Sequence, residues 1–348
     1  MDQGGQRNLF RRFHLYRAVT AAIALCSAAC GGGSSKTVTV YVSEDQVFSE
    51  PVLKDFERDS GITVRAVYDT EEAKSTGVVN RLIAEKQNAQ ADVYWANEPI
   101  RAEALKQQGI TAPYVSEAAT GIPADFKDPD GHWTGFSARG RVMIVNRNQH
   151  LPSVPDSVLT YTDSRFKGRG VIANPLFGTT TAYISALFAA WGDEKGNQFL
   201  NGLKSNGVRL STGNGETADM VASGEFAFGL ADTDDAVSRI RQGKPVTMVL
   251  PDQGDSQIGM LILPNAVMMI ASAPHPETAR RLIDYLLSKE TERKLAFADC
   301  AQIPLHPGVA VPAELKPLEA IKTMKVDYRK VAAKMRELQP ALKQWAGQ

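Results

Sequence analysis

The sequence predicts an α/β fold built as two lobes, and three observations support this expectation. Short β-branched runs alternate with amphipathic helical runs from about residue 37 to 109. A second series of the same kind occupies about residues 170–232. Two long apolar runs, residues 135–148 and 259–270, are placed to carry the chain from the first series to the second and back.

The first lobe begins with three β-α units. The strands are expected at TVTVYV (37–42), ITVRAVY (62–68) and DVYWA (92–96). The helices are expected from Pro51 to Arg58, after a Ser75 cap, and from Ile100 to Gln108. Three units at this spacing predict a parallel sheet with right-handed crossovers.

The second lobe follows a long strand, GFSARGRVMIVNRN (135–148), that leaves the first. Its helices are expected at 179–191, near 197–205 and near 216–223, and its last strand at FAFGLAD (226–232). GMLILPNAVMMI (259–270) returns to the first lobe, one amphipathic helix spans 275–298, and the segment from about 313 to 345 is helical. The expected boundaries are 37–138 plus 258–305 for lobe 1, and 139–257 plus 306–348 for lobe 2.

The N-terminal 29 residues have the pattern of a signal peptide. Four arginines precede an apolar run, Ala18 to Ala29, that is too short to span a bilayer. Cys30 follows directly and begins a Gly/Ser tether that reaches residue 36, which resembles a bacterial lipoprotein signal, although Ser27 stands where Leu is usual. The alternative is an ordinary cleaved signal that leaves an unmodified thiol at Cys30. We expect lipidation of Cys30 and a membrane-anchored protein in the periplasm or at the cell surface.

Composition excludes several classes of function. Beyond residue 29 the chain has 35 basic and 38 acidic residues without a basic stripe, so a nucleic-acid partner is not expected. Cys26 leaves with the signal and Cys30 is the lipidation site, so Cys300 alone remains and an intrachain disulfide is not expected. The sequence holds none of the familiar catalytic motifs for serine nucleophiles, phosphate-binding loops or zinc peptidases, which argues against an enzyme.

The candidate site residues follow the predicted strands, because ligands bind outside the carboxyl ends of strands in open α/β sheets. This rule selects Glu44, Asp45, Asn97 and Glu98 in the first lobe, and Gly178, Thr179, Thr180, Asn214, Asp232, Asp234 and Asp235 in the second. Arg139, at the start of the crossing strand, is added as a candidate anion-binding residue; its alternative is an interlobe salt bridge.

Two of these clusters have a definite chemistry. Gly178 to Thr181 precede a helix, where backbone N–H groups and hydroxyls favour an anion; the alternative is that a threonine only caps the helix. Asp232, Asp234 and Asp235 offer hard oxygen donors for a metal such as Fe(III), and they suit an organic ammonium group equally well. The alternative is that one aspartate caps the next helix and the others face water. Phenolate ligands from Tyr94 or Tyr183 are a minor alternative.

Several stretches resemble one known family. They are VTVYVSEDQVFSEPVLKDFERDSGITVRAVYDT, ADVYWANEP, FSARGRVMIVN, IANPLFGTTTAYISALFAAWG, SGEFAFGLADTDDA and LLSKETERKLAFADCAQIPL, in this order. The chain resembles the ferric-iron-type periplasmic substrate-binding proteins of ABC importers. The resemblance implies a type II periplasmic-binding-protein fold with a ligand cleft between lobes, an anion beside the metal at the Thr179 turn, and Glu98 as a metal ligand. It also implies delivery of the ligand to an ABC permease in the inner membrane.

One departure leaves the ligand open. The iron binders carry adjacent tyrosines where this sequence has Asp232-Thr233-Asp234-Asp235, and the first loop lacks the histidine of some members. The first hypothesis is a receptor for Fe(III) as cargo, with carboxylates replacing the tyrosines and a synergistic anion. The second is a receptor for a small organic anion or zwitterion such as an aminophosphonate. The third is a lipid-tethered enzyme or adhesion module on the same scaffold. A monomer without a resident cofactor is expected.

Overall fold

The computed structural model describes residues 36–69 and 76–347, together with Met1. The predicted signal peptide and Cys30 lie outside the described residues. The residues from Thr37 onward form one compact unit. In that unit, no helix among the described residues has an apolar stretch long enough to cross a membrane.

Ten strands of the described chain form one continuous sheet in the order β2-β1-β3-β10-β5-β8-β6-β7, with β4 added beside β10 and β9 beside β5. The strands are β1 (Thr37–Val42), β2 (Thr63–Tyr68), β3 (Val93–Ala96), β4 (Thr111–Ala112), β5 (Thr134–Asn146), β6 (Gly170–Ala173), β7 (Arg209–Ser211), β8 (Phe228–Asp232), β9 (Val246–Val249) and β10 (Ile262–Ile270). β1 pairs in parallel with β2 and β3, as β6 does with β7 and β8.

The long strand β5 connects the two lobes. Its residues up to Gly140 pair antiparallel with β10, and its residues from Arg141 pair antiparallel with β8. β10 in turn pairs antiparallel with β3, so the chain returns to the first lobe as the sequence predicts. Every residue of β5 is buried, which explains why this strand lacks the alternation of a half-exposed one.

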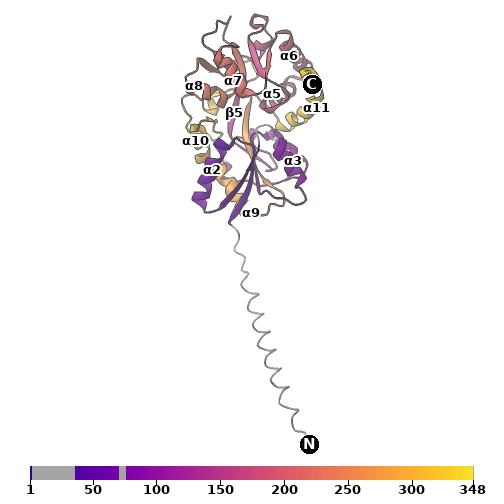
Figure 1. Ribbon diagram of the computed structural model, residues 1–348, viewed down its shortest axis with the longest axis vertical. Coiled ribbons are helices and arrows are strands. Elements are labelled where there is room, and N and C mark those ends of the chain that lie inside the picture. Colours follow the sequence, from indigo (N-terminus) through magenta and orange to yellow (C-terminus); the bar gives the residue numbers. More distant parts are fainter. Residues whose placement is uncertain (2–35, 70–75, 348) are drawn as a thin grey trace. The chain divides into compact units, whose positions relative to one another are not determined.

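The helices flank these strands and separate into two groups. They are α2 (Gln46–Ser60), α3 (Thr76–Ala84), α4 (Pro99–Gln107), α5 (Gly178–Trp191), α6 (Asp193–Ser205), α7 (Asn214–Ser223), α8 (Thr233–Arg241), α9 (Pro276–Leu286), α10 (Lys289–Phe297) and α11 (Tyr328–Ala346). Figure 1 shows α2, α3 and α9 around one end of β5 and α5 to α8 around the other. The C-terminal helix α11 packs against both α4 and α5 and therefore contacts both groups.

Three predicted helices have wrong limits. The helix predicted over 275–298 is two helices, because the Ser288 hydroxyl accepts a hydrogen bond from the Thr291 amide and starts α10 anew. The helix expected from about residue 313 begins only at Tyr328, where Asp327 caps it. α2 begins five residues before Pro51, at Gln46, so the proline lies inside the helix. The start of α2 matters for the site, because Asp45 is then the residue directly before a helix.

Candidate ligand-binding cleft

A cavity of about 310 Å³ lies where the loops after the strands of both lobes meet. It exceeds a single water site many times over and has the volume of a small-molecule pocket. The first lobe contributes residues after β1 and β3, and the second contributes residues after β6, β7 and β8, as the strand-end rule predicts. The lining residues are Asp45, Asn97, Glu98, Arg101, Arg139, Ala173, Phe177, Gly178, Thr179, Thr212, Gly213, Asn214, Gly215, Asp232, Asp234 and Asp235.

Two helices of the second lobe begin at this cavity. α5 starts at Gly178 and α7 at Asn214, and in neither helix does the N-cap residue, Phe177 or Gly213, provide a side-chain cap. The first N–H groups of a helix have no partner inside it, so these amides are available to an acceptor in the cavity. The predicted alternative, a threonine cap on α5, is therefore wrong. The Thr179 hydroxyl instead donates to Asp232 Oδ2 at 2.8 Å.

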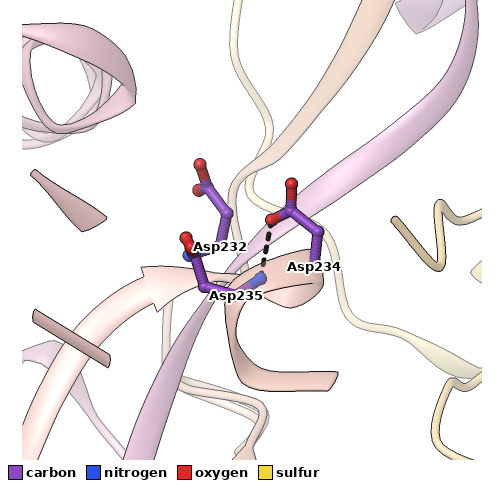
Figure 2. A group of neighbouring side chains, drawn as sticks. All are labelled: Asp232, Asp234 and Asp235. Atoms are coloured by element: carbon purple, nitrogen blue, oxygen red, sulfur yellow. Dashed lines mark hydrogen bonds between the residues drawn. The ribbon is translucent and has the colours of Figure 1, made fainter. Parts of the chain in front are cut away.

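Three carboxylates come together where β8 ends and α8 begins. The nearest oxygens of Asp232, Asp234 and Asp235 all lie within 4.8 Å of one another. Figure 2 shows the three side chains on the same side of this turn. The Asp235 amide donates to Asp234 Oδ1 at 3.0 Å, and the Asp232 amide donates to Asp235 Oδ2 at 3.3 Å. The turn itself thus fixes the orientation of the two later carboxylates.

A buried arginine binds the first of these aspartates. Arg141 on β5 has no exposed surface, and its Nη1 donates to Asp232 Oδ1 at 2.7 Å and to Thr179 Oγ1 at 2.9 Å. Asn214 Nδ2 donates to Asp232 Oδ2 at 3.1 Å. This network joins β5, α5, α7 and β8 directly behind the cavity wall. Asp232 is therefore engaged within the protein, and it forms a capping box with Asp235 at the start of α8, so an aspartate does cap this helix as the alternative predicted. Asp234 Oδ2 and Asp235 Oδ1, which accept no hydrogen bond from the described residues, are the oxygens of the two later carboxylates left for a ligand.

The pKa values of the three carboxyl groups diverge for physical reasons. Burial would raise the pKa of Asp232, but the guanidinium groups of Arg141 and Arg139 outweigh it and hold that pKa below the usual range. Burial raises the pKa of Asp234 to about 6, and the neighbouring charge of Asp232 adds to the effect against the opposing charge of Arg139. Burial also raises the pKa of Asp235 well above its usual value.

Arg139 lies between the two lobes, near carboxylates of both. It is 6% exposed, its Nη2 donates to the backbone oxygen of Asn97, and Glu44 Oε2 lies 3.8 Å from it. Its buried Nε has no hydrogen-bond partner among the described residues. Burial lowers the pKa of Arg139, but the nearby carboxylates of Glu44 and Asp234 outweigh this and raise it, so the group stays charged.

Glu98 and Arg101 form a pair at the start of α4. Glu98 is the N-cap of this helix, and its Oε2 accepts from the Ile100 amide at 2.5 Å. Its Oε1 accepts from Arg101 Nη1 at 2.9 Å. Sequence reasoning selected Glu98 and missed Arg101, although the spacing of three residues on a helix is a signal for such a pair.

Most of the predicted site residues line the cavity, but two do not. Glu44 is buried and accepts from Gln302 Nε2 at 2.8 Å. The Thr180 hydroxyl accepts from Arg141 Nη2 at 3.2 Å and donates to Asn214 Oδ1 at 3.3 Å. Glu44 thus contacts the segment after α10, and Thr180 contacts β5 and α7, which the strand-end rule does not resolve.

Tyrosine ligands find no support in the described part of the cavity, whose lining includes neither tyrosine nor histidine. The Tyr94 hydroxyl lies 2.8 Å from Ser43 Oγ, and burial raises its pKa. Burial likewise raises the pKa of Tyr183. Neither Tyr94 nor Tyr183 is among the residues that line the cavity.

Comparison with known protein families assigns the chain to one of them. Residues 97–330 match the family model described as bacterial extracellular solute-binding protein. The chain belongs to this family. A solute-binding protein with this cleft agrees with the sequence-based expectation of a receptor and not an enzyme.

The names of two relatives of this solute-binding protein refer to different ligands, iron and 2-aminoethylphosphonate. It is 27% identical over 302 residues to iron uptake protein A1 of Synechocystis sp., covering 82% of this chain and 81% of the relative. It is 26% identical over 286 residues to a putative 2-aminoethylphosphonate-binding periplasmic protein of Salmonella paratyphi A, covering 80% and 81%.

Solved structures confirm the two-lobed fold. The ferric binding protein from Campylobacter jejuni superposes with a TM-score of 0.79 at 19% identity, covering 89% of this chain and 99% of that one. The periplasmic binding protein AfuA from Actinobacillus pleuropneumoniae, with fructose-6-phosphate bound, has a TM-score of 0.76 at 21% identity, covering 90% and 99%. At these identities the comparison concerns the fold alone.

Proposed function

We propose that this solute-binding protein is the receptor of an ABC importer and that it captures a small zwitterion, such as an aminophosphonate, by closing its two lobes. The observation that carries the proposal is the separation of charge in one cavity. Free helix N-terminal amides lie at Gly178 and Asn214, and the carboxylates of Asp234 and Asp235 lie nearby. The amides suit an acid group and the carboxylates suit an amine.

The charges of the cavity favour a ligand that carries a cationic group. Glu98 is paired with Arg101, and Asp232 is paired with Arg141. Asp234 and Asp235 form no close salt bridge among the described residues, and the guanidinium groups of Arg139 and Arg239 lower their pKa values less than burial and the neighbouring carboxylates raise them. A simple dianion would meet these carboxylates without a counter-charge of its own, whereas the amine of a zwitterion supplies that charge.

Fe(III) with a synergistic anion is a second candidate, and the carboxylate cluster favours it. Three oxygens within 4.8 Å of one another are hard donors of the kind that Fe(III) prefers. The weakness of this candidate is that Asp232 is bound to Arg141 and Glu98 caps α4, so two of its four proposed ligands are already engaged. In either case the ion or molecule is cargo and not a resident cofactor.

Calorimetry on the purified mature protein distinguishes the two candidates. The expected result is stoichiometric binding of 2-aminoethylphosphonate and no uptake of Fe(III), offered as its citrate complex with and without phosphate. Stoichiometric iron uptake without aminophosphonate binding would support the second candidate. Native mass spectrometry of undialysed protein then identifies the cargo that the cell supplies.

Delivery to a permease and attachment at the membrane belong to the same proposal. The family description supports an extracellular solute-binding role, and the closed form is the one that a permease would recognise. Cys30 is proposed as the lipid anchor in the periplasm or at the cell surface, with the Gly/Ser tether separating it from the folded unit. Replacing Cys30 by Ser is expected to move the protein from the membrane fraction to the soluble fraction.

A further inference from the structure

We propose that Arg101 is the specificity-determining residue of the first lobe, that it selects a tetrahedral acid group on the ligand, and that Glu98 is its positioning residue. This inference rests on the proposed function, because it assigns the first-lobe partner of the ligand's acid group. The juxtaposition behind it is an arginine on one lobe and two helix N-termini on the other, all lining one cavity.

Arg101 has donors to offer a ligand. Its side chain is 21% exposed and lines the cavity. Nη1 donates to Glu98 Oε1 at 2.9 Å, whereas Nε and Nη2 donate to no side chain or backbone oxygen of the described residues. A guanidinium has five N–H groups in a fixed planar fork. Several of these N–H groups therefore remain for a ligand.

Glu98 fixes the orientation of this arginine. Its Oε2 accepts from the Ile100 amide, and its Oε1 accepts from the Arg101 amide at 3.2 Å as well as from Nη1. The carboxylate is therefore held by the backbone of α4 before it meets the guanidinium. Because Glu98 is held by the backbone, it restricts Arg101 to few side-chain rotamers before a ligand binds. Arg101 therefore loses less conformational entropy on binding. Glu98 acts on the ligand through Arg101 and not as a direct ligand.

Donors from both lobes determine which acid group fits best. The amides at Gly178 and Asn214 approach from the second lobe, and Arg101 approaches from the first. Arg139, with its buried and unpartnered Nε, marks the same cavity as a place for an acceptor. A planar carboxylate directs its two oxygens within one plane, whereas a phosphonate directs three oxygens in different directions. A tetrahedral acid can therefore accept from both lobes together.

The test compares 2-aminoethylphosphonate with β-alanine, which carries the same amine and a carboxylate. Wild-type protein is expected to bind the phosphonate more tightly. Arg101→Gln is expected to weaken phosphonate binding by roughly 10- to 100-fold, the usual effect of losing hydrogen bonds to a charged group. The same variant is expected to reduce the preference for phosphonate over β-alanine. Arg101→Lys, which keeps the charge and loses the fork, is expected to lie between the two.

Glu98→Asp separates the positioning role from a merely structural one. Aspartate is a favoured N-cap residue but is one methylene shorter, so α4 keeps its cap while the contact to Arg101 is lost. The expected result is an unchanged melting temperature with weaker phosphonate binding. Arg280→Gln, on an exposed side chain of α9 outside the cavity, is the matched control and is expected to bind like wild type.

Each outcome bears either on the ligand class or on the role of Arg101. Wild-type protein that binds neither zwitterion overturns the proposed ligand class and the role of Arg101 together. Wild-type protein that binds the phosphonate, with folded Arg101→Gln binding equally well, overturns the role of Arg101 alone. An Arg101→Gln variant that weakens both ligands equally removes the selection of a tetrahedral acid. If that variant does not fold, Arg101→Lys and Glu98→Asp test the same two points.

Discussion

At the scale of single residues, the site depends on how buried charges pair. Arg141 is fully buried and binds Asp232, so one negative charge of the aspartate cluster is neutralised by the protein itself. Asp234 and Asp235 have no such ion pair among the described residues, and burial raises the pKa of both. In this turn Asp232 therefore has a structural role, whereas the charged forms of Asp234 and Asp235 are incompletely stabilised. This is the behaviour expected of carboxylates that bind a cationic ligand.

The Asp234→Asn variant is expected to be more stable than wild type at neutral pH and to bind the ligand more weakly. The pKa of Asp234 is about 6 in the folded protein and near 3.8 when the chain unfolds, so the folded state binds its proton more tightly. Ionisation of Asp234 therefore lowers the free energy of unfolding, and this loss is complete above about pH 6. As the pH falls from 6 toward 4, Asp234 takes up its proton and the free energy of unfolding rises again. The variant should unfold at higher urea concentration than wild type at pH 7, with the difference vanishing near pH 4.

Ligand binding supplies the second readout for Asp234. An amine ligand needs the ionised carboxylate, so wild-type affinity for 2-aminoethylphosphonate is expected to decrease as the pH falls from 7 to 5. Asp234→Asn should bind weakly at both pH values. A wild-type affinity that stays constant over this range would contradict the assignment of Asp234 to the amine.

At the scale of secondary-structure elements, one glutamate ties the crossing strand to its neighbours. Glu292 on α10 is fully buried, and its Oε1 accepts from the amides of Ser137 on β5 and Leu305, each at 2.9 Å. Its Oε2 accepts from the His306 amide and lies 2.9 Å from His306 Nδ1. Ser137 has a φ of 38°, a strained conformation for a residue with a side chain, and the bond to Glu292 holds it there.

Glu292→Gln is expected to destabilise the protein by roughly 3 kcal/mol or more. The amide NH₂ group takes the place of a carboxylate oxygen, so a donor faces the buried backbone N–H groups and leaves them without an acceptor. Urea denaturation of the two proteins at pH 7 measures the change. Glu290→Gln on the same helix is the control, since its side chain is 55% exposed and surface pairs contribute little. Equal unfolding free energies for the two variants would show that the buried carboxylate is not needed to hold the crossing strand.

At the scale of the whole folded unit, β5 and β10 join two lobes around one cavity. Because β5 belongs to both halves of the sheet, a change of its twist near Gly140 and Arg141 would move the cavity walls against each other. The carboxylates at α8 and the amides at α5 and α7 lie on the second lobe, whereas Arg101 lies on the first. A ligand that contacts both walls favours the closed arrangement by its differential affinity.

Closure is expected to be visible in solution. Small-angle X-ray scattering should show a smaller radius of gyration with saturating 2-aminoethylphosphonate than without it. The same ligand at about 100 times its Kd should add about 2.7 kcal/mol to the free energy of unfolding by mass action. β-Alanine, which engages fewer donors, should compact the protein less at the same concentration. Binding by calorimetry with unchanged scattering would contradict lobe closure.

Much of the fold could be predicted from local patterns. The β-branched runs at 37–42 and 92–96, and the apolar run at 259–270, correspond to strands at the expected places. The helix limits were less accurate, although Ser288 and Asp327 are N-caps of local kind, each accepting from an amide two or three residues further on, and are residue types that favour helix starts. The strand-end rule identified most of the cavity wall, since the carboxyl ends of parallel strands lie at one edge of a sheet.

The sequence by itself determined the fold class, the family resemblance and the loops that form the cleft, because these follow from periodicity and from motifs that are continuous in the chain. Only the tertiary structure decided which charged groups are available. Arg141 and Asp232 are 91 positions apart and become a buried pair through the pairing of β5 with β8. Glu44 is not among the residues that line the cavity, and it accepts a hydrogen bond from Gln302, 258 positions away. Electrostatic partnership depends on distance in space and on burial, and neither quantity is contained in a local pattern of residues.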